Sequence, residues 1–447
     1  PLDSLHVSAL STASALCALL LLGVLAGCDS GNSPGPLDQR QQLRQLLAAA
    51  DVRAVEPPPP APPAMIQLGQ ALFFDKVLSG DRNIGCSTCH NPGYHTSDNL
   101  ELSIGTGGQR PGASRQLGSG QFTLRHSSDL FDRGQPAWRE LMWDGRVEQG
   151  SGGPRALTGA ELPAGLSGVL AAQALLPMAS RIEMRGAGLN EVAALPDTAY
   201  QAIYDALAAR LRALPGYDSL FQAAYPGLPS DSLNIARAAN AIAAFIGSTW
   251  QTGGTPFDRY LLGDTAALTE PARRGALLFF GRAGCSKCHR GDLLTDQAFH
   301  NTGIPVLLSD GLPDLGRASL TGQDGDRYRF RTPPLRNVSL TPPFMHNGSL
   351  RTLAEVVAHY ANPVESLRSF DPSRLDPRLQ SALDLSPARL DDVVAHLDSK
   401  LVATRPLDSQ DQADLVSFLR ALTDPASSIL LDDIPRAVPS GLPVFDH

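Results

Sequence analysis

The 447-residue chain lacks several features that mark common functional classes. It has no cluster of lysine and arginine residues and a net charge of -8, so it lacks the surface that nucleic acid would require. Strand-like alternation of apolar and polar residues is weak throughout, which favours a mainly helical protein. Cysteine is scarce, with six residues. What is present is 43% hydrophobic residues, 36 prolines and 41 glycines, enough for two or three loop-rich domains.

One long apolar run stands near the start of the sequence. Residues 9–30 read ALSTASALCALLLLGVLAGCDS, a run of signal-peptide length that ends in small residues. Its end, Leu25 to Cys28, resembles the lipobox of bacterial lipoproteins, in which the cysteine is lipidated. Residues 1–8 hold no lysine or arginine, so the basic start of such a signal would lie upstream. The alternative is a transmembrane anchor or a buried helix, which the shortness of the run disfavours.

We therefore expect residues 1–28 to be a signal peptide and the rest of the chain to be exported to the periplasm or cell envelope, attached to a membrane through lipid on Cys28. Residues 29–64 are expected to be a flexible tether. They begin with a polar stretch and end in EPPPPAPPA, which favours extended polyproline geometry.

Four of the six cysteines fall into two identical patterns. The sequence reads Cys-Ser-Thr-Cys-His at 86–90 and Cys-Ser-Lys-Cys-His at 285–289. C-x-x-C-H is the attachment signature of c-type haem: two thiols bond to the porphyrin, and the following histidine binds the iron. Disulfides or a zinc site are the alternatives, but neither needs a histidine after each pair. We predict two covalent haem c groups, on Cys86, Cys89 and His90, and on Cys285, Cys288 and His289.

The two attachment motifs end two similar stretches. Residues 68–90 and 273–289 each show a short helix with a Leu/Phe face, a glycine-containing loop and the motif. This predicts a mainly α protein with two cytochrome-c-like helical domains, at 65–231 and 232–430, before a C-terminal tail at 431–447. A helix is expected over 232–250, with Ser232 as its N-cap.

Eight segments in one order carry a more specific resemblance. They are the first haem motif, LMWDGR (141–146), MASRIEMRG (178–186), TPFDRYLLGD (255–264), the second haem motif, FHNTGIP (299–305), TPPLRNVSLTPPFMHNGSLRTLAEVVAHY (332–360) and DQADLVSFLRALTD (411–424). From residue 65 to about 440 the chain resembles the bacterial di-haem cytochrome c peroxidase and MauG superfamily. The resemblance implies that hydrogen peroxide reacts at the N-terminal haem and that the C-terminal haem passes or stores electrons.

The resemblance also implies roles at the first haem. In the peroxidase branch a loop histidine caps this iron. The matching loop, SIGTGG (103–108), has Thr106 in that place, which implies an open iron. Glu183 matches the acid/base of MauG-like proteins, Gln173 a hydrogen-bond partner of bound oxygen species, and Pro177 a residue that shapes access. The alternative for Glu183 is a solvated carboxylate paired with a neighbouring arginine. His95 and His126 are interpreted as ordinary loop histidines.

Two further positions follow from the same resemblance. Trp143 corresponds to a tryptophan that relays electrons between the haems; its alternative role is a core aromatic. Family members often hold calcium with two backbone carbonyls, which match Thr341 and Pro343. The usual asparagine ligand is His126 here, and imidazole is a poor ligand for this hard cation.

The helix before residue 361 predicts the last iron ligand. Thr352 and Glu355 form a capping box, so the helix begins there. Leu353, Val356, Val357 and Tyr360 share one face, whereas His359 lies about 100° away, turned to solvent or a polar contact. The peroxidase branch has methionine at the position of Tyr360, as sixth ligand of the C-terminal haem. Tyrosinate there would favour oxidised iron. The alternative is that Tyr360 is plain core.

These observations predict an exported enzyme that uses hydrogen peroxide and forms a high-valent two-haem state. That state would oxidise a residue of a partner protein, as in the MauG branch. Residues 125–134 and 434–444 resemble the methanobactin-associated MbnH-type subgroup. One alternative is a peroxidase that takes electrons from a small redox protein. The other is a non-catalytic di-haem electron carrier or redox sensor.

Overall fold

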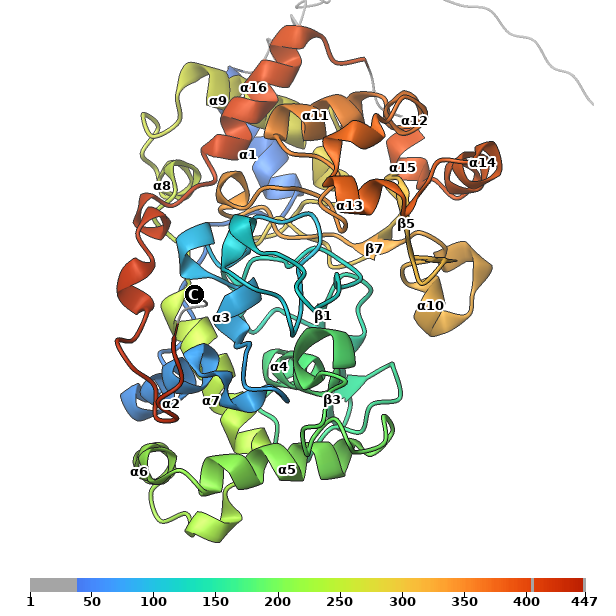
Figure 1. The fold of residues 1–447 in the computed structure, drawn as a ribbon. Coiled ribbons are helices and arrows are strands. Elements are labelled where there is room, and N and C mark those ends of the chain that lie inside the picture. Colours follow the sequence, from blue (N-terminus) through green and yellow to red (C-terminus); the bar gives the residue numbers. More distant parts are fainter. Residues whose placement is uncertain (1–37, 403–405, 445–447) are drawn as a thin grey trace, which may run out of the picture. The chain divides into compact units, whose positions relative to one another are not determined.

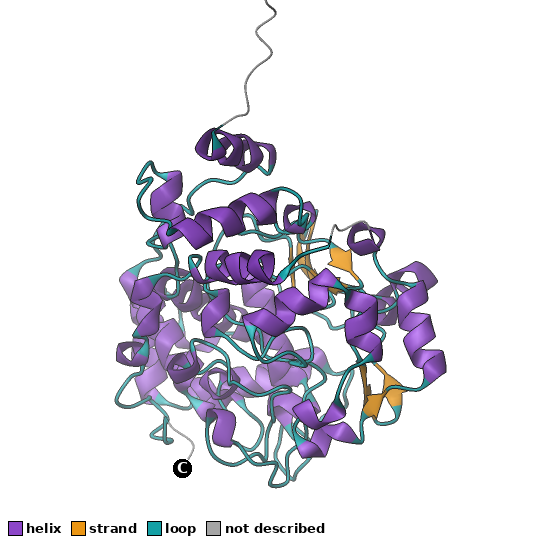
Figure 2. Ribbon diagram, turned by 90° about the horizontal axis from the view of Figure 1, so that it is seen from above, coloured by secondary structure: helices purple, strands orange, loops and turns teal. Residues whose placement is uncertain are grey.

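The computed structural model describes residues 38–402 and 406–444 (Figure 1). The predicted signal peptide, the lipobox cysteine Cys28 and the first part of the predicted tether lie outside these residues. Helices and loops make up nearly all of the described chain, with a few short strands, as Figure 2 shows. The predicted mainly α fold is thus confirmed. Among the described residues, no helix combines the length and apolar character needed to cross a bilayer.

The N-terminal half is built on the first of two large hydrophobic cores. Its helices are α2 (Pro63–Phe74), α3 (Cys86–Cys89), α4 (Val169–Ala179), α5 (Tyr200–Arg212), α6 (Pro215–Ala224) and α7 (Ile235–Thr249). A small antiparallel sheet joins β1 (Glu140–Leu141), β2 (Val147–Gly150) and β3 (Gly153–Ala156) in that order. Helices α2 and α7 cross so closely that a Cβ on Gly69 would lie 1.9 Å from the carbonyl oxygen of Ala241.

The C-terminal half surrounds the second core. Its longer helices are α8 (Pro256–Leu261), α9 (Glu270–Phe280), α11 (Leu353–Ala361), α12 (Pro363–Arg368), α14 (Pro387–Ala395) and α16 (Ser409–Arg420). Single-turn helices are α10 (Ala318–Thr321), α13 (Pro377–Gln380) and α15 (Ser399–Val402). Strand β4 (Phe299–His300) pairs with β7 (Phe330–Arg331), and β5 (Val306–Ser309) lies between β6 (Leu312–Pro313) and β8 (Leu383–Asp384).

The two halves repeat one packing device. In α9, a Cβ on Gly275 would lie 1.9 Å from the carbonyl oxygen of Asp414 in α16, just as Gly69 of α2 meets α7. Each glycine stands in the helix that leads into an attachment motif, and the helix ends in two phenylalanines. The repeat seen in the sequence is therefore a repeat of close helix crossings, because only glycine leaves room for the facing backbone.

The boundaries of the two halves differ from the predicted ones. Helix α7 lies wholly in the first core, so the division comes after Trp250 rather than at residue 232. The helix begins later than predicted: the side chain of Asn234, not Ser232, caps it by accepting a hydrogen bond from the backbone N–H of Arg237 (3.1 Å). Both residue types are good N-caps, and packing of the helix selects between them.

The predicted tether is wrong for its described C-terminal part. Residues Gln39–Ala49 form helix α1, which packs on α9 and buries Leu43 and Leu47 in the second core (Figure 1). Val52 continues this contact, and Val55 reaches the first core. The stretch looks polar in the sequence, but its leucine and valine side chains pack on the two cores.

The predicted C-terminal tail also packs on the body. Leu430 and Val438 belong to the first core, although the chain has just left α16 of the second. Asp433 accepts a hydrogen bond from the indole N–H of Trp250 (2.9 Å), and the hydroxyl of Ser440 donates to buried Asp75 (2.6 Å). The two ends of the described chain thus cross over, each packing on the opposite half.

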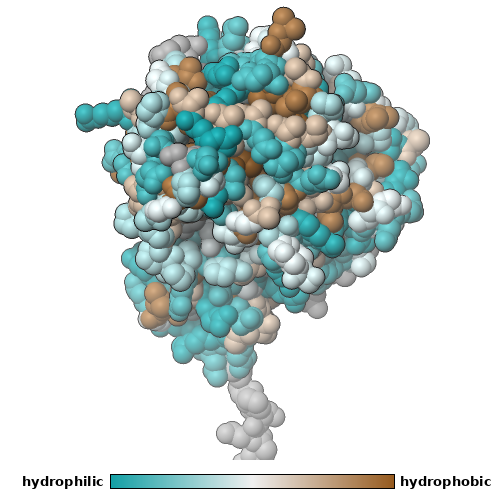
Figure 3. All heavy atoms as spheres, turned by 90° about the horizontal axis from the view of Figure 1, so that it is seen from below, coloured by the Kyte–Doolittle hydropathy of each residue, from teal (hydrophilic) through white to brown (hydrophobic). Residues whose placement is uncertain are grey.

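Hydrophilic and hydrophobic residues are intermingled on the face drawn in Figure 3. Among the described residues, the large hydrophobic side chains that are most exposed are Leu124, Leu189, Leu262, Leu312, Ile429 and Leu431. Most stand alone in the sequence, which is ordinary for a protein surface.

Candidate active site

Each attachment motif follows a helix of the repeat after a connecting segment, residues 75–85 in the first half and 281–284 in the second. The first forms helix α3, with His90 as its C-cap residue; the second forms a single helical turn, Cys285–Lys287, before Cys288 and His289. All four cysteines are free, so within the described chain no disulfide uses them.

Both motif histidines are oriented as iron ligands require. The Nδ1 atom of His90 lies 3.1 Å from the carbonyl oxygen of Thr96, and that of His289 lies 2.9 Å from the carbonyl oxygen of Leu294. Such a contact fixes the tautomer and leaves Nε2 free for a metal. Burial lowers the pKa of His90 to about 4, so its ring is neutral at pH 7, the form that binds iron. These residues fit a c-type haem at each motif.

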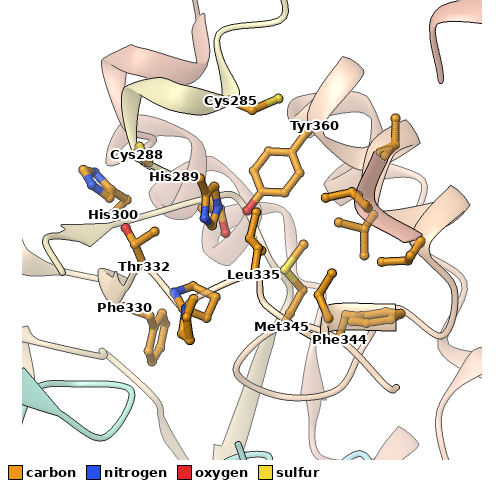
Figure 4. Close-up of a pocket in the computed structure, with 18 of the residues that line it drawn as sticks. Cys285, Cys288, His289, His300, Phe330, Thr332, Leu335, Phe344, Met345 and Tyr360 are labelled. Carbon is orange, nitrogen blue, oxygen red and sulfur yellow. The ribbon is translucent and has the colours of Figure 1, made fainter. Parts of the chain in front are cut away.

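A cavity lies beside the second motif and is called the second cavity below (Figure 4). Cys285, Cys288, His289 and Tyr360 all line it. In Figure 4 the hydroxyl of Tyr360 points toward the side of the cavity where the His289 ring lies. Burial raises the pKa of Tyr360, so its oxygen becomes an anion only if a cation such as iron compensates the charge.

Helix α11 orients Tyr360 as its sequence predicts. Thr352 and Glu355 form the expected capping box, and Leu353, Val356 and Val357 line the same cavity. This face of the helix borders the cavity as well as the second core. Leu353 and Val357 belong to that core but Tyr360 does not, which argues against Tyr360 as plain core.

The neighbouring His359 points elsewhere. Its Nε2 lies 2.7 Å from the carbonyl oxygen of Thr302, and its Nδ1 lies 3.0 Å from the hydroxyl of Ser366. Both ring nitrogens are thus engaged away from the cavity. The sequence left open whether His359 turns to solvent or to a polar contact. Since the residue is 2% exposed, the polar contact is the one that it makes.

Near the first motif, Glu183 lies in a π-helical turn, Arg181–Arg185, that directly follows α4. Its two arginine neighbours form ion pairs with Asp197 (2.6 and 2.9 Å), not with Glu183. This disfavours the solvated ion pair as the role of Glu183. Burial, and then the charges of Asp98 and Glu183, raise the pKa of Cys89, which places the Glu183 carboxylate close to the attachment site.

Gln173 and Pro177 lie on α4, four residues apart and therefore on one face. The side-chain oxygen of Gln173 is buried and has no hydrogen-bond partner among the described residues. A buried polar atom without a partner is costly, so this oxygen fits a site completed by a bound group.

The loop that would carry a capping histidine is tied to the Glu183 turn. The backbone N–H of Thr106 donates to the carbonyl oxygen of Glu183 (2.9 Å), and its hydroxyl donates to Asn83 (2.8 Å). The two spare histidines also have other contacts. His95 Nδ1 lies 3.1 Å from the Ser427 carbonyl oxygen, and His126 Nδ1 lies 2.9 Å from the Leu100 carbonyl oxygen.

Trp143 lies where the two halves meet and borders the second cavity. Its indole N–H donates to the carbonyl oxygen of His126 (2.8 Å), and its own carbonyl oxygen accepts from the backbone N–H of Arg331 (2.7 Å). The N-terminal half thus holds the indole, and the C-terminal half holds the backbone of the same residue. Trp250, by contrast, packs against Phe73 and Phe245 within the first core.

Sequence reasoning missed the charged groups around Trp143. Buried Arg125 binds Asp314 through two hydrogen bonds of 2.8 Å, and its Nη1 lies 2.5 Å from Asp144, an ion contact without hydrogen-bond geometry. His300 lies between Asp398 (2.6 Å) and Asp296 (3.2 Å) beside the second cavity. No local sequence signal identifies such pairs, because their partners are up to 189 residues apart.

The residues expected to hold calcium line one cavity, but the side chains that could complete the site have other partners. Thr341 and Pro343 both line the second cavity, as does His126. The two side chains that could replace the missing asparagine are engaged: the hydroxyl of Ser127 donates to the carbonyl oxygen of Cys89 (2.9 Å), and Asp129 pairs with Arg133 (3.3 Å).

The fold and its two attachment sites define a helical protein with two c-type haems. The family model "Di-haem cytochrome c peroxidase" matches residues 63–266. A cytochrome-c peroxidase IdrP2 of Pseudomonas sp. (strain SCT) is 30% identical over 76% of this chain and 85% of its own. The chain therefore belongs to the di-haem cytochrome c peroxidase and MauG family, whose members are haem oxidoreductases that use peroxide.

Two other similar proteins are of the MauG type. The methylamine utilization protein MauG of Methylorubrum extorquens is 29% identical over 91% of this chain and 92% of its own. A solved MauG-like protein associated with microbial copper homeostasis is 28% identical, with a TM-score of 0.59, over 86% of this chain and 97% of its own.

Proposed function

We propose that this protein uses hydrogen peroxide to oxidise a residue of a partner protein. The observation that carries the proposal is Tyr360, which borders the second cavity together with His289. An anionic oxygen ligand stabilises oxidised iron, which suits storage of an oxidising equivalent better than rapid uptake of electrons from a donor. The similarity to a MauG-like protein of copper homeostasis over 86% of this chain also supports oxidation of a partner protein.

The haems, when bound, supply the oxidising chemistry; the residues around them control protons and access. Glu183 moves a proton between the two oxygens of peroxide, because its carboxylate is not held by a neighbouring arginine. Gln173 orients the oxygen species through its free side-chain oxygen or amide. Pro177, on the same helix face, limits the space for larger molecules.

Trp143 carries oxidising equivalents between the two sites. It borders the second cavity, its indole is bonded to the N-terminal half, and its backbone is bonded to the C-terminal half. Reduction of one peroxide to two waters consumes two electrons and two protons, which the partner residue loses. The partner is thus the reductant, and a tryptophan or tyrosine side chain has the chemistry to be oxidised in this way.

The second candidate is a peroxidase supplied with electrons by a small redox protein. Similarity to the IdrP2 peroxidase over 76% of the chain favours it. A non-catalytic electron carrier is disfavoured, because the Thr106 hydroxyl, at the place of a capping ligand, is bonded to Asn83.

Export to the periplasm, a lipid anchor on Cys28 and a calcium ion at Thr341 and Pro343 belong to the same proposal. Export is supported by the two attachment motifs, because c-type haem is attached outside the cytoplasm. Calcium is supported by the position of both residues on one cavity.

Electron paramagnetic resonance and peroxide titration test the proposal. The oxidised protein should show a high-spin ferric signal from an open first site. Peroxide added with a candidate partner should lower the mass of one partner peptide by the two hydrogen atoms it loses, with Glu183→Gln protein as the control. Steady turnover with reduced cytochrome c and no change in partner mass would refute protein oxidation and support the peroxidase. Two low-spin signals with no reaction would refute both.

A further inference from the structure

Arg331 is a buried cation that forms no ion pair with any residue the structure describes. It ends strand β7 and is 4% exposed. Its Nε donates to the carbonyl oxygen of Met142 (3.1 Å), and its Nη1 donates to that of Thr332 (3.3 Å). No carboxylate of the described chain forms a salt bridge with it. Burial is the main cause that lowers its pKa to about 9.

A second buried arginine increases the positive charge at this place. Arg133 lies over the Trp138 ring at 4.9 Å, and Arg331 lies over the same ring at 5.1 Å. One carboxylate, Asp129, pairs with Arg133 at 3.3 Å, but the Nη1 of Arg133 is buried without a partner. Two guanidinium groups therefore share one ion-paired carboxylate, while Glu140 attracts Arg331 only from beyond ion-pair distance.

Two other buried arginines that link distant elements do not share this imbalance. Arg125 has Asp144 and Asp314, and Arg336 has Asp258 at 2.7 Å. An unpaired buried cation costs several kcal/mol, so a site that keeps one usually binds an anion. The position of Arg331 shows where that anion would come from: it lines the cavity that also holds Cys288, His289 and Tyr360.

We propose that Arg331, supported by Arg133, is the counter-ion of a propionate of the haem attached at Cys285 and Cys288. A haem carries two propionate carboxylates, and a guanidinium group binds a carboxylate with two parallel hydrogen bonds. The assignment rests on the second haem, which family membership implies. It does not depend on whether a partner protein or a small donor is oxidised.

The pairing has a consequence for the haem. Arginine neutralises the propionate charge close to the iron. Without it, the anionic carboxylate stabilises ferric iron and lowers the reduction potential. When Arg331 is replaced by a neutral residue, the ratio of oxidised to reduced second haem at a fixed solution potential should rise about tenfold. This corresponds to a reduction potential lower by about 59 mV for a one-electron couple.

The test uses the holoprotein without peroxide or partner. Arg331→Gln and Arg331→Lys are compared with Arg336→Gln, a matched removal of a buried arginine outside the cavity. Spectroelectrochemistry measures the potential of each haem, and resonance Raman spectroscopy measures the propionate bending bands. Arg331→Gln should lower the second potential and shift its propionate band. Arg331→Lys should shift the band with a smaller change of potential, and Arg336→Gln should change neither.

An unchanged propionate band in Arg331→Lys would overturn the assignment, even if Arg331→Gln fails to fold. A change limited to the first haem, or an equal change in Arg336→Gln, would also overturn it. Because no partner is present, these outcomes are independent of whether protein oxidation occurs.

Discussion

The ion pairs of Arg125 join the two halves next to Trp143, and their removal should weaken the interface measurably. In Arg125→Met, buried Asp314 loses its two hydrogen bonds of 2.8 Å and keeps only the backbone N–H of Gly316. Asp144 loses one partner but keeps Arg146 at 2.8 Å. Leaving a buried charge unpaired costs about 3–5 kcal/mol. We expect Arg125→Met to lower the free energy of unfolding by about 3 kcal/mol, because only Asp314 is left without a cation.

The pH dependence of stability provides a second, independent test of this prediction. Burial alone would raise the pKa of Asp314, but the hydrogen bonds and charge of Arg125 lower it below its ordinary value of 3.8. A lowered pKa in the folded state adds stability above pH 3.8 that is lost as the pH falls through the folded value. Since Arg125→Met removes this contribution, the difference between the two proteins should narrow as the pH falls below about 4.

Urea unfolding of the holoprotein, followed by circular dichroism at several pH values, measures both effects. Asp314→Asn added to Arg125→Met removes the unpaired charge, so the double variant should recover at least about 1 kcal/mol. The reasoning is refuted if Arg125→Met lowers the free energy of unfolding by less than about 1 kcal/mol at pH 7. A difference between wild type and variant that stays constant from pH 7 to pH 3 would refute it as well.

Three further predictions concern single residues. Tyr360→Phe should change the absorption spectrum of the second haem and raise its potential, whereas Tyr328→Phe, outside the cavity, should do neither; an unchanged spectrum would mean that Tyr360 is only core. Glu183→Gln should slow the reaction with peroxide by about 10²–10⁴-fold in stopped-flow mixing, with exposed Glu161→Gln as a control at the wild-type rate. Gly275→Ala should lower the free energy of unfolding by about 1–3 kcal/mol, because its Cβ meets the Asp414 carbonyl, whereas Gly325→Ala should cost nothing beyond propensity.

Much of the site could be predicted from short stretches of sequence, because the chemistry there is local. C-x-x-C-H places two thiols and an imidazole within five residues, so no tertiary contact is needed to recognise it. The capping box at Thr352 sets the start of α11, and helical geometry then orients Tyr360 and His359. The glycine before each pair of phenylalanines likewise marks a close helix crossing.

The tertiary structure decided the rest, because the relevant partners are far apart along the chain. Leu43 and Leu47 look like isolated apolar residues in a polar stretch until α9 covers them. Ser440 meets Asp75 across 365 residues, which turns an apparent tail into part of the first half. The unbalanced charge of Arg331 is visible only once its neighbours are known, since an arginine in a sequence gives no sign of being buried. Local geometry thus predicts the candidate haem ligands, and long-range packing determines what surrounds them.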